Sequence, residues 1–489
     1  MLHVMRDPFV ENALDPSLYV APVPLWAGVP FFALLLAMGV APLVNKHWWD
    51  RYYPAVSIGL GGMTAAYYAL MRAAPLPILR SEIEFISFIA LIGSLYVITG
   101  GIHIRLRGRS RPLTNVAFLA LGALMANLVG TTGASMVLIR PFIHVNRYRI
   151  KAYHIVFFIF VVSNIGGGLT PIGDPPLFLG YLKGVPFFWV LQSTWHIWLV
   201  TMTIVLTVFY VIDRRVYMNL SPGRRSRTEG MGEKGEVVGL HNLFFLAVVL
   251  CAVFVVDPPF VREGLMVSAA LGSWFTTRKE IHKKNDFDFV PIKEVAVLFL
   301  GIFTTMVPVL EWITQNSTGL GLWFAAQFYW ATGALSAFLD SAPTYLNFLG
   351  AAVGVFVDPD LVREISRLLH VQPPGSATLA GDVSVQARMI LESLLRYHGE
   401  SVRSGTVTID QITTSCLMTF HETVVQAISL GAVFFGAMTY IGNVPNLMVK
   451  SIAEQSGVRC PSFGSYIGLY SIPVLLPTFI IIWGIFFRN

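Results

Sequence analysis

Two copies of an uncommon helix-breaking motif lie inside stretches that are apolar enough for a membrane. The copies, Thr170–Pro176 (TPIGDPP) and Thr439–Pro445 (TYIGNVP), both read T-x-I-G-[D/N]-x-P. Proline lacks the N–H donor and glycine loosens the backbone, so the motif interrupts a helix. In hydrocarbon, irregular backbone persists only where protein buries it or where it lines a cavity. Two matched breaks therefore predict a binding site near the middle of the membrane.

The composition identifies a polytopic membrane protein. Of 489 residues, 55% are hydrophobic and 13% are charged, whereas a soluble domain carries about 25% charged residues. The net charge of +6 comes from basic residues scattered in short loops, which excludes a nucleic-acid groove. Cys251, Cys416 and Cys460 lack the spacing of a disulfide framework or a zinc site. The mixed-charge N-terminus is unlike a signal peptide, and we interpret it as a retained tail.

Apolar runs of about 20 residues cross a bilayer, and the sequence predicts ten such crossings. The fourth and ninth of these are too long for one helix, and each contains a T-x-I-G break, so we expect a helix–loop–helix in both. The crossings are 22–44, 54–72, 83–101, 152–184, 185–212, 241–257, 262–277, 291–313, 413–458 and 463–487.

Two further apolar stretches, 115–143 and 318–352, are predicted to be re-entrant hairpins. Basic residues flank the first one at both ends, in Arg105–Arg111 and in Arg140–Lys151. Because Lys and Arg concentrate on the cytoplasmic side of short loops, both ends of this stretch belong inside the cell. Its tip would be Gly130–Ser135, and the second hairpin would open to the outer face. Ten crossings then place both termini outside.

The fold class that follows is an all-α polytopic membrane protein built as an inverted repeat of two halves. Each half has three spans, a re-entrant hairpin, a broken helix and a final span. The hairpin tips lie 209 residues apart and the breaks 269 apart, and a polar outer insert accounts for most of the difference. The predicted divisions are an N-terminal tail (1–21), the first repeat (22–212), a cytoplasmic linker (213–240) and the second repeat (241–489), which carries the insert (358–412).

The hairpin tips and the breaks supply oxygen atoms where water is absent. Sodium prefers such ligands, while the positive N-terminal ends of half-helices would suit an anion. The candidate residues for substrate or ion binding are Thr131, Thr132 and Ser135 at the inner tip, Asp340, Ser341 and Thr344 at the outer tip, Thr170, Gly173 and Asp174 at the first break, and Thr439, Gly442 and Asn443 at the second. Asn127 and Asn446 lie close by in the sequence.

The carboxyl groups of Asp174 and Asp340 carry the most specific chemistry. An ionised carboxylate at the bilayer centre costs at least about 2.5–3.5 kcal/mol, so its presence calls for a reason. A carboxylate that holds either a proton or a sodium ion is the minimal chemistry of a cation/proton exchanger. Thr132, Asp174, Asp340 and Asn443 are the candidate sodium ligands. As alternatives, Asp174 could only cap the following half-helix, and Asp340 could be a hairpin-tip carboxylate in an aqueous vestibule.

At these residues the chain resembles the ion transporter superfamily. This group includes divalent-anion/sodium symporters, citrate transporters, arsenite permeases and NhaD-type sodium/proton antiporters. The resemblance rests on Gly166–Pro176, the tip Thr131–Ser135, and the pair Leu339–Pro343 and Thr439–Pro445. It implies sodium sites at the tips and breaks, a transport domain that moves like an elevator, and a homodimer. The tips read Thr-Thr-Gly and Asp-Ser-Ala where dicarboxylate symporters usually have Ser-Asn-Thr, which makes dicarboxylate recognition less favoured.

The sequence therefore favours a secondary active transporter that exchanges sodium for protons, in the inner membrane of a bacterium. The second hypothesis is sodium- or proton-coupled uptake of citrate or another carboxylate. An intramembrane enzyme or sensor is the third, and we find no catalytic constellation for it. We expect no cofactor, with Na⁺ and H⁺ as transported or coupling ions. The expected partners are small ions or a small organic anion, the lipid bilayer and a second copy of the chain, and no nucleic acid.

Overall fold

The computed structural model describes residues 22–105, 110–221, 236–255, 260–285, 287–316, 319, 321–371 and 384–488. Helices make up nearly all of these residues, and a short ladder of two antiparallel strands pairs His103 with Val238. The predicted tail 1–21, the linker residues 222–235 and the insert residues 372–383 lie outside the described part.

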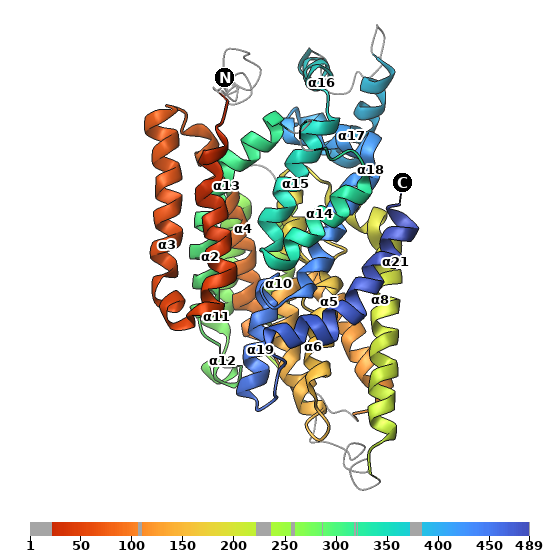
Figure 1. Ribbon diagram of the computed structural model, residues 1–489. Coiled ribbons are helices and arrows are strands. Elements are labelled where there is room, and N and C mark those ends of the chain that lie inside the picture. Colours follow the sequence, from red (N-terminus) through yellow and green to blue (C-terminus); the bar gives the residue numbers. More distant parts are fainter. Residues whose placement is uncertain are drawn as a thin grey trace.

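The first half of the chain contains three helices, a long bent helix, a broken helix and a final helix (Figure 1). The elements are η2 (Leu25–Gly28), α2 (Val29–Val44), α3 (Lys46–Ala66), η3 (Tyr67–Met71), α4 (Leu76–Gly100), β1 (His103–Arg105), α5 (Pro112–Val145), α6 (Ala152–Val161), η4 (Ile165–Gly167), α7 (Pro175–Leu182) and α8 (Phe187–Met218).

The second half repeats this order, with two additional helices in the insert. The elements are β2 (Glu236–Val238), α10 (Asn242–Ala252), α11 (Val261–Thr276), α12 (Lys279–Lys284), α13 (Val290–Asn316), α14 (Ala325–Phe338), α15 (Ser341–Phe356), α16 (Pro359–Val371), α17 (Val385–Ser404), α18 (Ile409–Phe435), η6 (Gly436–Met438), α19 (Val444–Gln455), α20 (Phe463–Tyr466), η7 (Ile467–Leu475) and α21 (Leu476–Phe486). The order of elements agrees with the predicted one, while the inversion of one half relative to the other stays a prediction.

Seven helices in the described part are long and apolar enough to cross a membrane, or eight if the bent pair α15–α16 counts as one span. Six of the seven overlap expected crossings, and the seventh is α5, the expected first hairpin. The other four expected crossings correspond to α3, which is more polar, to α10 and α11, which are shorter, and to the broken helix α6–α7. The chain is therefore an all-α, multi-pass integral membrane protein.

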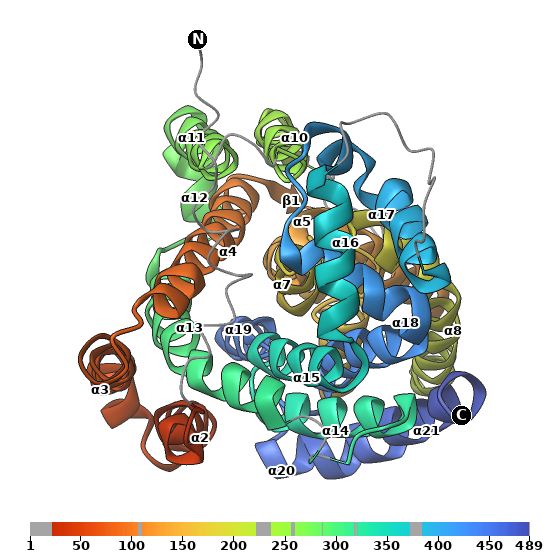
Figure 2. The ribbon, with the colours of Figure 1, turned by 90° about the horizontal axis from the view of Figure 1, so that it is seen from above.

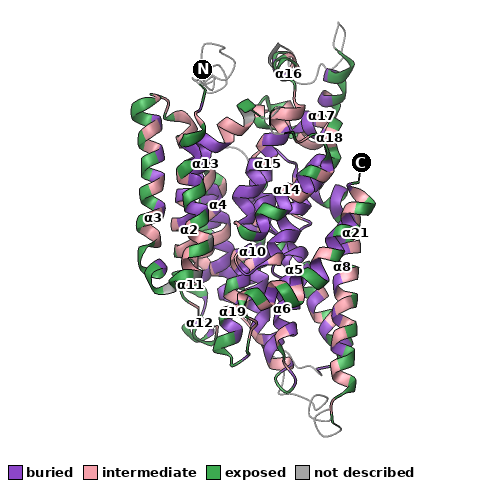
Figure 3. Ribbon diagram, viewed as in Figure 1, coloured by how far each residue is buried: buried purple, intermediate pink, exposed green. Residues whose placement is uncertain are grey.

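The helices form two groups that pack side by side (Figure 2). A flanking group consists of α2, α3, α4, α10, α11 and α13, which contact one another. A central group consists of α5, α6, α7, α14, α15, α18 and α19, and α13 and α4 of the flanking group pack against its members α15, α5 and α7. The central group carries most of the buried residues, whereas α3 and α8 expose one face along their length (Figure 3). The candidate site lies in the central group.

The insert packs on the central group through a small apolar cluster of its own. Ile365 of α16 and Ile390 and Leu394 of α17 are fully buried against Ile412 and Cys416 of α18. Helices α16 and α17 lie at the opposite end of the molecule from α12 (Figure 1). Helix α12 contains Lys279, Lys283 and Lys284, and the concentration of basic residues in cytoplasmic short loops predicts that it faces the cytoplasm. This arrangement fits an insert on the other side of the membrane, and the absolute orientation stays a prediction.

Candidate functional site

Both T-x-I-G motifs interrupt a helix, as predicted. The first separates η4 from α7 and the second separates η6 from α19. Pro175 and Pro445 stand in the first turn of the half-helix that follows, where the missing N–H costs nothing. The chain folds back closely at each break, because a Cβ on Gly173 would lie 2.2 Å from the Gly167 carbonyl oxygen and one on Gly442 would lie 2.7 Å from that of Gly436. Only glycine allows this approach.

The threonine of each motif fastens the break to the neighbouring hairpin. Thr170 Oγ1 donates to the Asn127 carbonyl at 2.7 Å and accepts from the Gly173 N–H at 3.1 Å. Thr439 Oγ1 donates to the Ala337 carbonyl at 2.5 Å and accepts from the Gly442 N–H at 3.1 Å. The two hydroxyls therefore do the same work in the two halves, and both are already engaged as donor and acceptor.

Two helix–turn–helix elements occupy the stretches where the sequence predicts hairpins, and their re-entry into one face of the membrane stays a prediction. Helix α5 turns back at Gly130, whose φ of 77° and ψ of 154° are non-helical. Its second arm begins at Thr131, whose N–H donates to the Gly173 carbonyl at 2.8 Å. The other hairpin consists of α14 and α15, and its turn is Leu339–Asp340. Each tip is thus a point where a new helix starts.

Asp174 of the first break contacts both the first hairpin tip and the second break. Its Oδ1 accepts from Thr131 Oγ1 of the first tip at 2.8 Å and from Asn443 Nδ2 of the second break at 3.0 Å. Asp174 occupies the N-cap position of α7, but its side chain makes no capping hydrogen bond, so the interpretation of Asp174 as a cap alone is wrong. Its other oxygen, Oδ2, is buried without a hydrogen-bond partner. A buried carboxylate oxygen without a partner needs a proton, a water molecule or a cation to offset the cost of its burial.

Asp340 completes the set from the second tip. Its Oδ1 accepts from the Ala342 N–H at 3.0 Å and so caps α15. The side chain is 8% exposed and lines two adjoining cavities. Next to it, Ser341 is fully buried and its hydroxyl has no partner, while the Thr344 hydroxyl donates to the Asp340 carbonyl at 2.9 Å.

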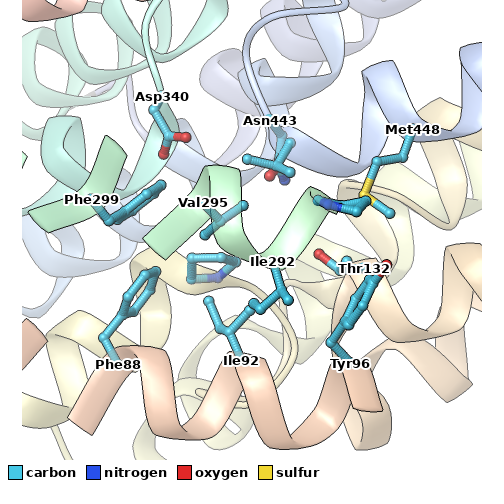
Figure 4. A pocket seen from close by; sticks show the side chains of 13 residues that line it. Phe88, Ile92, Tyr96, Thr132, Ile292, Val295, Phe299, Asp340, Asn443 and Met448 are labelled. Carbon is cyan, nitrogen blue, oxygen red and sulfur yellow. The ribbon is translucent and has the colours of Figure 1, made fainter. Parts of the chain in front are cut away.

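Three adjoining cavities surround the tips and the breaks. The smallest, of about 20 Å³, is lined by Thr132, Asp340 and Asn443 on one side and by Phe88, Ile92 and Tyr96 of α4 on the other (Figure 4). A second, of about 30 Å³, is lined by Thr131, Thr132, Gly173 and Asp174. Both can hold an ion or one to two waters, since one water needs roughly 10–15 Å³ on this measure.

The third cavity is large enough for a small organic anion. Its volume is about 150 Å³, and it extends from Asp340 and Asn443 to Glu294 of α13 and to the end of α2. Lys, Arg and His do not occur among the described residues that line the three cavities. The walls therefore offer carboxylates, amides, hydroxyls and helix ends, without a basic side chain.

The structure places the predicted sodium ligands around the same space. Thr132, Asp340 and Asn443 line one cavity, and Asp174 lines the next one together with Thr132. Ser135 lies one turn below its tip and shares a hydrogen bond of 2.8 Å with Ser163, so it supports the break more than it faces the cavities. The described residues contain no group of three or more His, Cys, Asp or Glu side chains of the kind that holds a metal ion.

Sequence reasoning missed Asn164, which connects the two breaks. Its Nδ2 donates to Asn446 Oδ1 at 2.7 Å, and its Oδ1 accepts from Asn443 Nδ2 at 3.3 Å. Asn446 in turn donates to the carbonyls of Gly436 and Thr439, both at 2.9 Å. At the motif offset of 269 residues, Asn164 corresponds to Val433. The internal repeat therefore gave no signal for it.

One family model covers residues 20–487 and carries the description "Putative citrate transport". The chain belongs to this family. Comparison with curated protein sequences gives no match. The match spans nearly all of the described helices, including both hairpins and both breaks. Membership supports the resemblance to the citrate transporters of the superfamily. It does not support assignment to the NhaD-type antiporters.

Proposed function

We propose that the protein is a secondary transporter that takes up citrate or a related small carboxylate together with cations. The family description carries the substrate class, and it favours the second of our sequence-based hypotheses over sodium/proton exchange. The carboxylate would bind in the cavity of about 150 Å³ beside the two tips. The cations would bind at the two smaller cavities.

Four helix N-termini support binding of an anion at this place. The second arm of α5, α7, α15 and α19 all start at residues that line or adjoin the cavities: Thr131, Pro175, Ser341 and Val444. The N-terminus of a helix carries about half a positive charge. This charge remains at the second arm of α5 and at α15, although one N–H group at each end already donates to the Gly173 carbonyl and to Asp340 Oδ1. Carboxylate groups are therefore stabilised there without a lysine or an arginine.

The acidic lining supports obligatory coupling to cations. A polycarboxylate that enters the large cavity meets the side chain of Asp340, and no basic residue lines the wall of its described part. Like charges at close range repel strongly where water is scarce. Citrate would therefore enter only with sodium ions, protons or other cations that balance the charge. We assign Asp340, which faces the cavity, to the exchangeable cation.

Asp174 would hold a second cation at a more enclosed place. Asp174, whose Oδ2 is unpaired, lines the cavity of about 30 Å³ together with Thr131 and Thr132. Because its Oδ1 is fixed by Thr131 and Asn443, a cation bound at Oδ2 would tie the first tip to the second break. Binding of the cation would thus prepare the tips for the carboxylate.

The test is uptake of labelled citrate into proteoliposomes under imposed sodium or proton gradients. We expect uptake that depends on one of the two gradients and that Asp340→Asn abolishes. Asp360→Asn is the matched control, since this carboxylate lies on the surface of α16 with 78% of its side chain exposed. Absence of citrate uptake under every gradient, with the protein folded, refutes the proposal.

Sodium/proton exchange is the second candidate, and the two aspartates beside ion-sized cavities favour it. In everted vesicles without an organic anion, an exchanger collapses a preformed pH gradient when sodium is added. Collapse without citrate uptake would select the exchanger. Citrate uptake without collapse would exclude it.

A further inference from the structure

We propose that the acyl chain of a membrane lipid occupies an apolar cavity between the second hairpin and the flanking helices. This cavity has a volume of about 280 Å³ and is separate from the three cavities at the tips. One wall comes from η2, α2 and α13 and includes Gly28, Phe32 and Trp312. The opposite wall comes from α14 and α15 and includes Leu335 and Ala351.

The lining suits hydrocarbon and not water. Of its 13 residues, 12 are apolar, aromatic, proline or glycine. The exception is Asn347, whose Nδ2 donates to the Pro343 carbonyl of its own helix at 2.9 Å and whose buried Oδ1 has no hydrogen-bond partner. An engineered apolar cavity of about 150 Å³ stays dry and binds benzene, so a larger one with such walls takes up hydrocarbon when hydrocarbon can enter.

The position of the cavity gives lipid access to it. Leu25, Phe32 and Leu335 line it and are 63%, 52% and 38% exposed. The helices of the first wall belong to segments long and apolar enough to span a membrane, Leu25–Pro42 and Val290–Ile313. In a multi-pass membrane protein such exposed side chains face lipid, whose acyl chains are then the available partner of matching chemistry.

The two walls belong to the two helix groups, and this gives the occupant a mechanical effect. A chain seated between Phe32 and Trp312 on one side and Ala351 on the other contacts both groups, so any displacement of the hairpin against α13 would have to expel it. The lipid chain therefore stabilises the present arrangement and slows transport. This effect rests on the proposed transport function, whereas the binding itself does not.

Fluorescence quenching by phosphatidylcholine with brominated acyl chains tests the binding directly, because Trp312 lines the cavity. The contribution of Trp312 is the difference between the emission of the native protein and that of Trp312→Phe in the same lipid. We expect this difference to fall several-fold when brominated chains replace ordinary ones. Ala351→Phe, which fills the cavity, should restore the Trp312 emission in brominated lipid.

The control is Ala334→Phe, which adds the same side chain to an exposed position of α14 that does not line the cavity. It should leave the quenching unchanged. If the Trp312 emission is not quenched, no brominated chain lies beside Trp312 and the proposal is wrong. If it is quenched equally in Ala351→Phe, the proposal is also wrong, because contact with bulk lipid then explains the signal. Should Ala351→Phe fail to fold, the smaller Ala351→Leu provides the same comparison.

Transport measured in the same variants separates this proposal from the proposed function. Ala351→Phe should change the rate of citrate uptake while Ala334→Phe does not. If no variant and not even the native protein transports citrate, the proposed function fails, and the quenching result still decides whether a lipid chain occupies the cavity.

Discussion

Replacement of Asn446 by leucine tests whether the amide contacts hold the two broken helices together. The side chain is fully buried and forms three hydrogen bonds: it donates to the carbonyls of Gly436 and Thr439 and accepts from Asn164. Leucine is similar in size and forms none of them. Asn164 keeps two partners, since its Nδ2 also donates to the Ile159 carbonyl at 2.8 Å and its Oδ1 accepts from Asn443 Nδ2 at 3.3 Å.

The three bonds set the expected magnitude. A buried hydrogen bond contributes about 1 kcal/mol in soluble proteins and on average about 0.6 kcal/mol between membrane helices, so the loss of three costs about 2–3 kcal/mol. The carbonyls of Gly436 and Thr439 lose the Asn446 donor, which increases the expected loss of stability. A surface substitution, by comparison, stays within about 0.5 kcal/mol.

The assay is unfolding in mixed micelles with increasing detergent denaturant, with Asn219→Leu as the control, because Asn219 is exposed at the end of α8. Asn164→Leu and the double variant complete a thermodynamic cycle. The bond between Asn164 and Asn446 predicts that the double variant loses less stability than the sum of the single ones. A loss below about 0.5 kcal/mol for Asn446→Leu, or strictly additive effects, would refute the assignment of these amides as the clamp between the breaks.

Three further predictions follow from the site and from the insert. Asp340→Asn should abolish citrate uptake under every cation gradient, and unchanged uptake and pH dependence would take Asp340 out of the mechanism. Lys183→Met should loosen α7 from α4, because Lys183 Nζ lies 2.5 Å from Glu84 Oε1; faster hydrogen exchange at 181–185 checks this, and the charge reversal Lys183→Glu with Glu84→Lys should restore slow exchange. Burial lowers the pKa of His398 in α17, whose Nε2 lies 3.1 Å from the Gly184 carbonyl oxygen. The unfolded insert then binds the proton more readily, so its packing is stable at neutral pH and weakens as the pH falls through about 6.5; His398→Gln should remove this pH dependence of exchange in α17.

Local chemistry made the breaks and the tips predictable. Glycine and proline within an apolar run interrupt a helix. The T-x-I-G motifs therefore located both breaks. The basic residues on both sides of 115–143 located the first hairpin, whose turn at Gly130 is the first residue of the expected tip. The expectation that Thr131, Asp174, Asp340 and Asn443 gather in one place rested on the repeat, and the structure brings them around adjoining cavities.

Contacts between distant segments could not be predicted in the same way. Asn164 is one of several amides in the sequence, and only the folded chain places it beside Asn443 and Asn446. Arg149 was interpreted as a cytoplasmic charge that orients the chain, yet its side chain is buried and its guanidinium pairs with Asp213 of α8, with Nη2 2.9 Å from Oδ2. The concentration of basic residues in cytoplasmic loops predicts on which side a loop lies. It does not predict which arginine forms an ion pair with a carboxylate.

The contact between Asp174 and Asn443 joins the two positions that correspond in the T-x-I-G motifs. Two identical halves with aspartate at both positions would bring two anions face to face, whereas the present pair is an acceptor and a donor. The difference between the copies is thus what lets them touch. Aspartate in place of Asn443 would remove the donor, so the two breaks would then keep this contact only with a proton shared between the two acids.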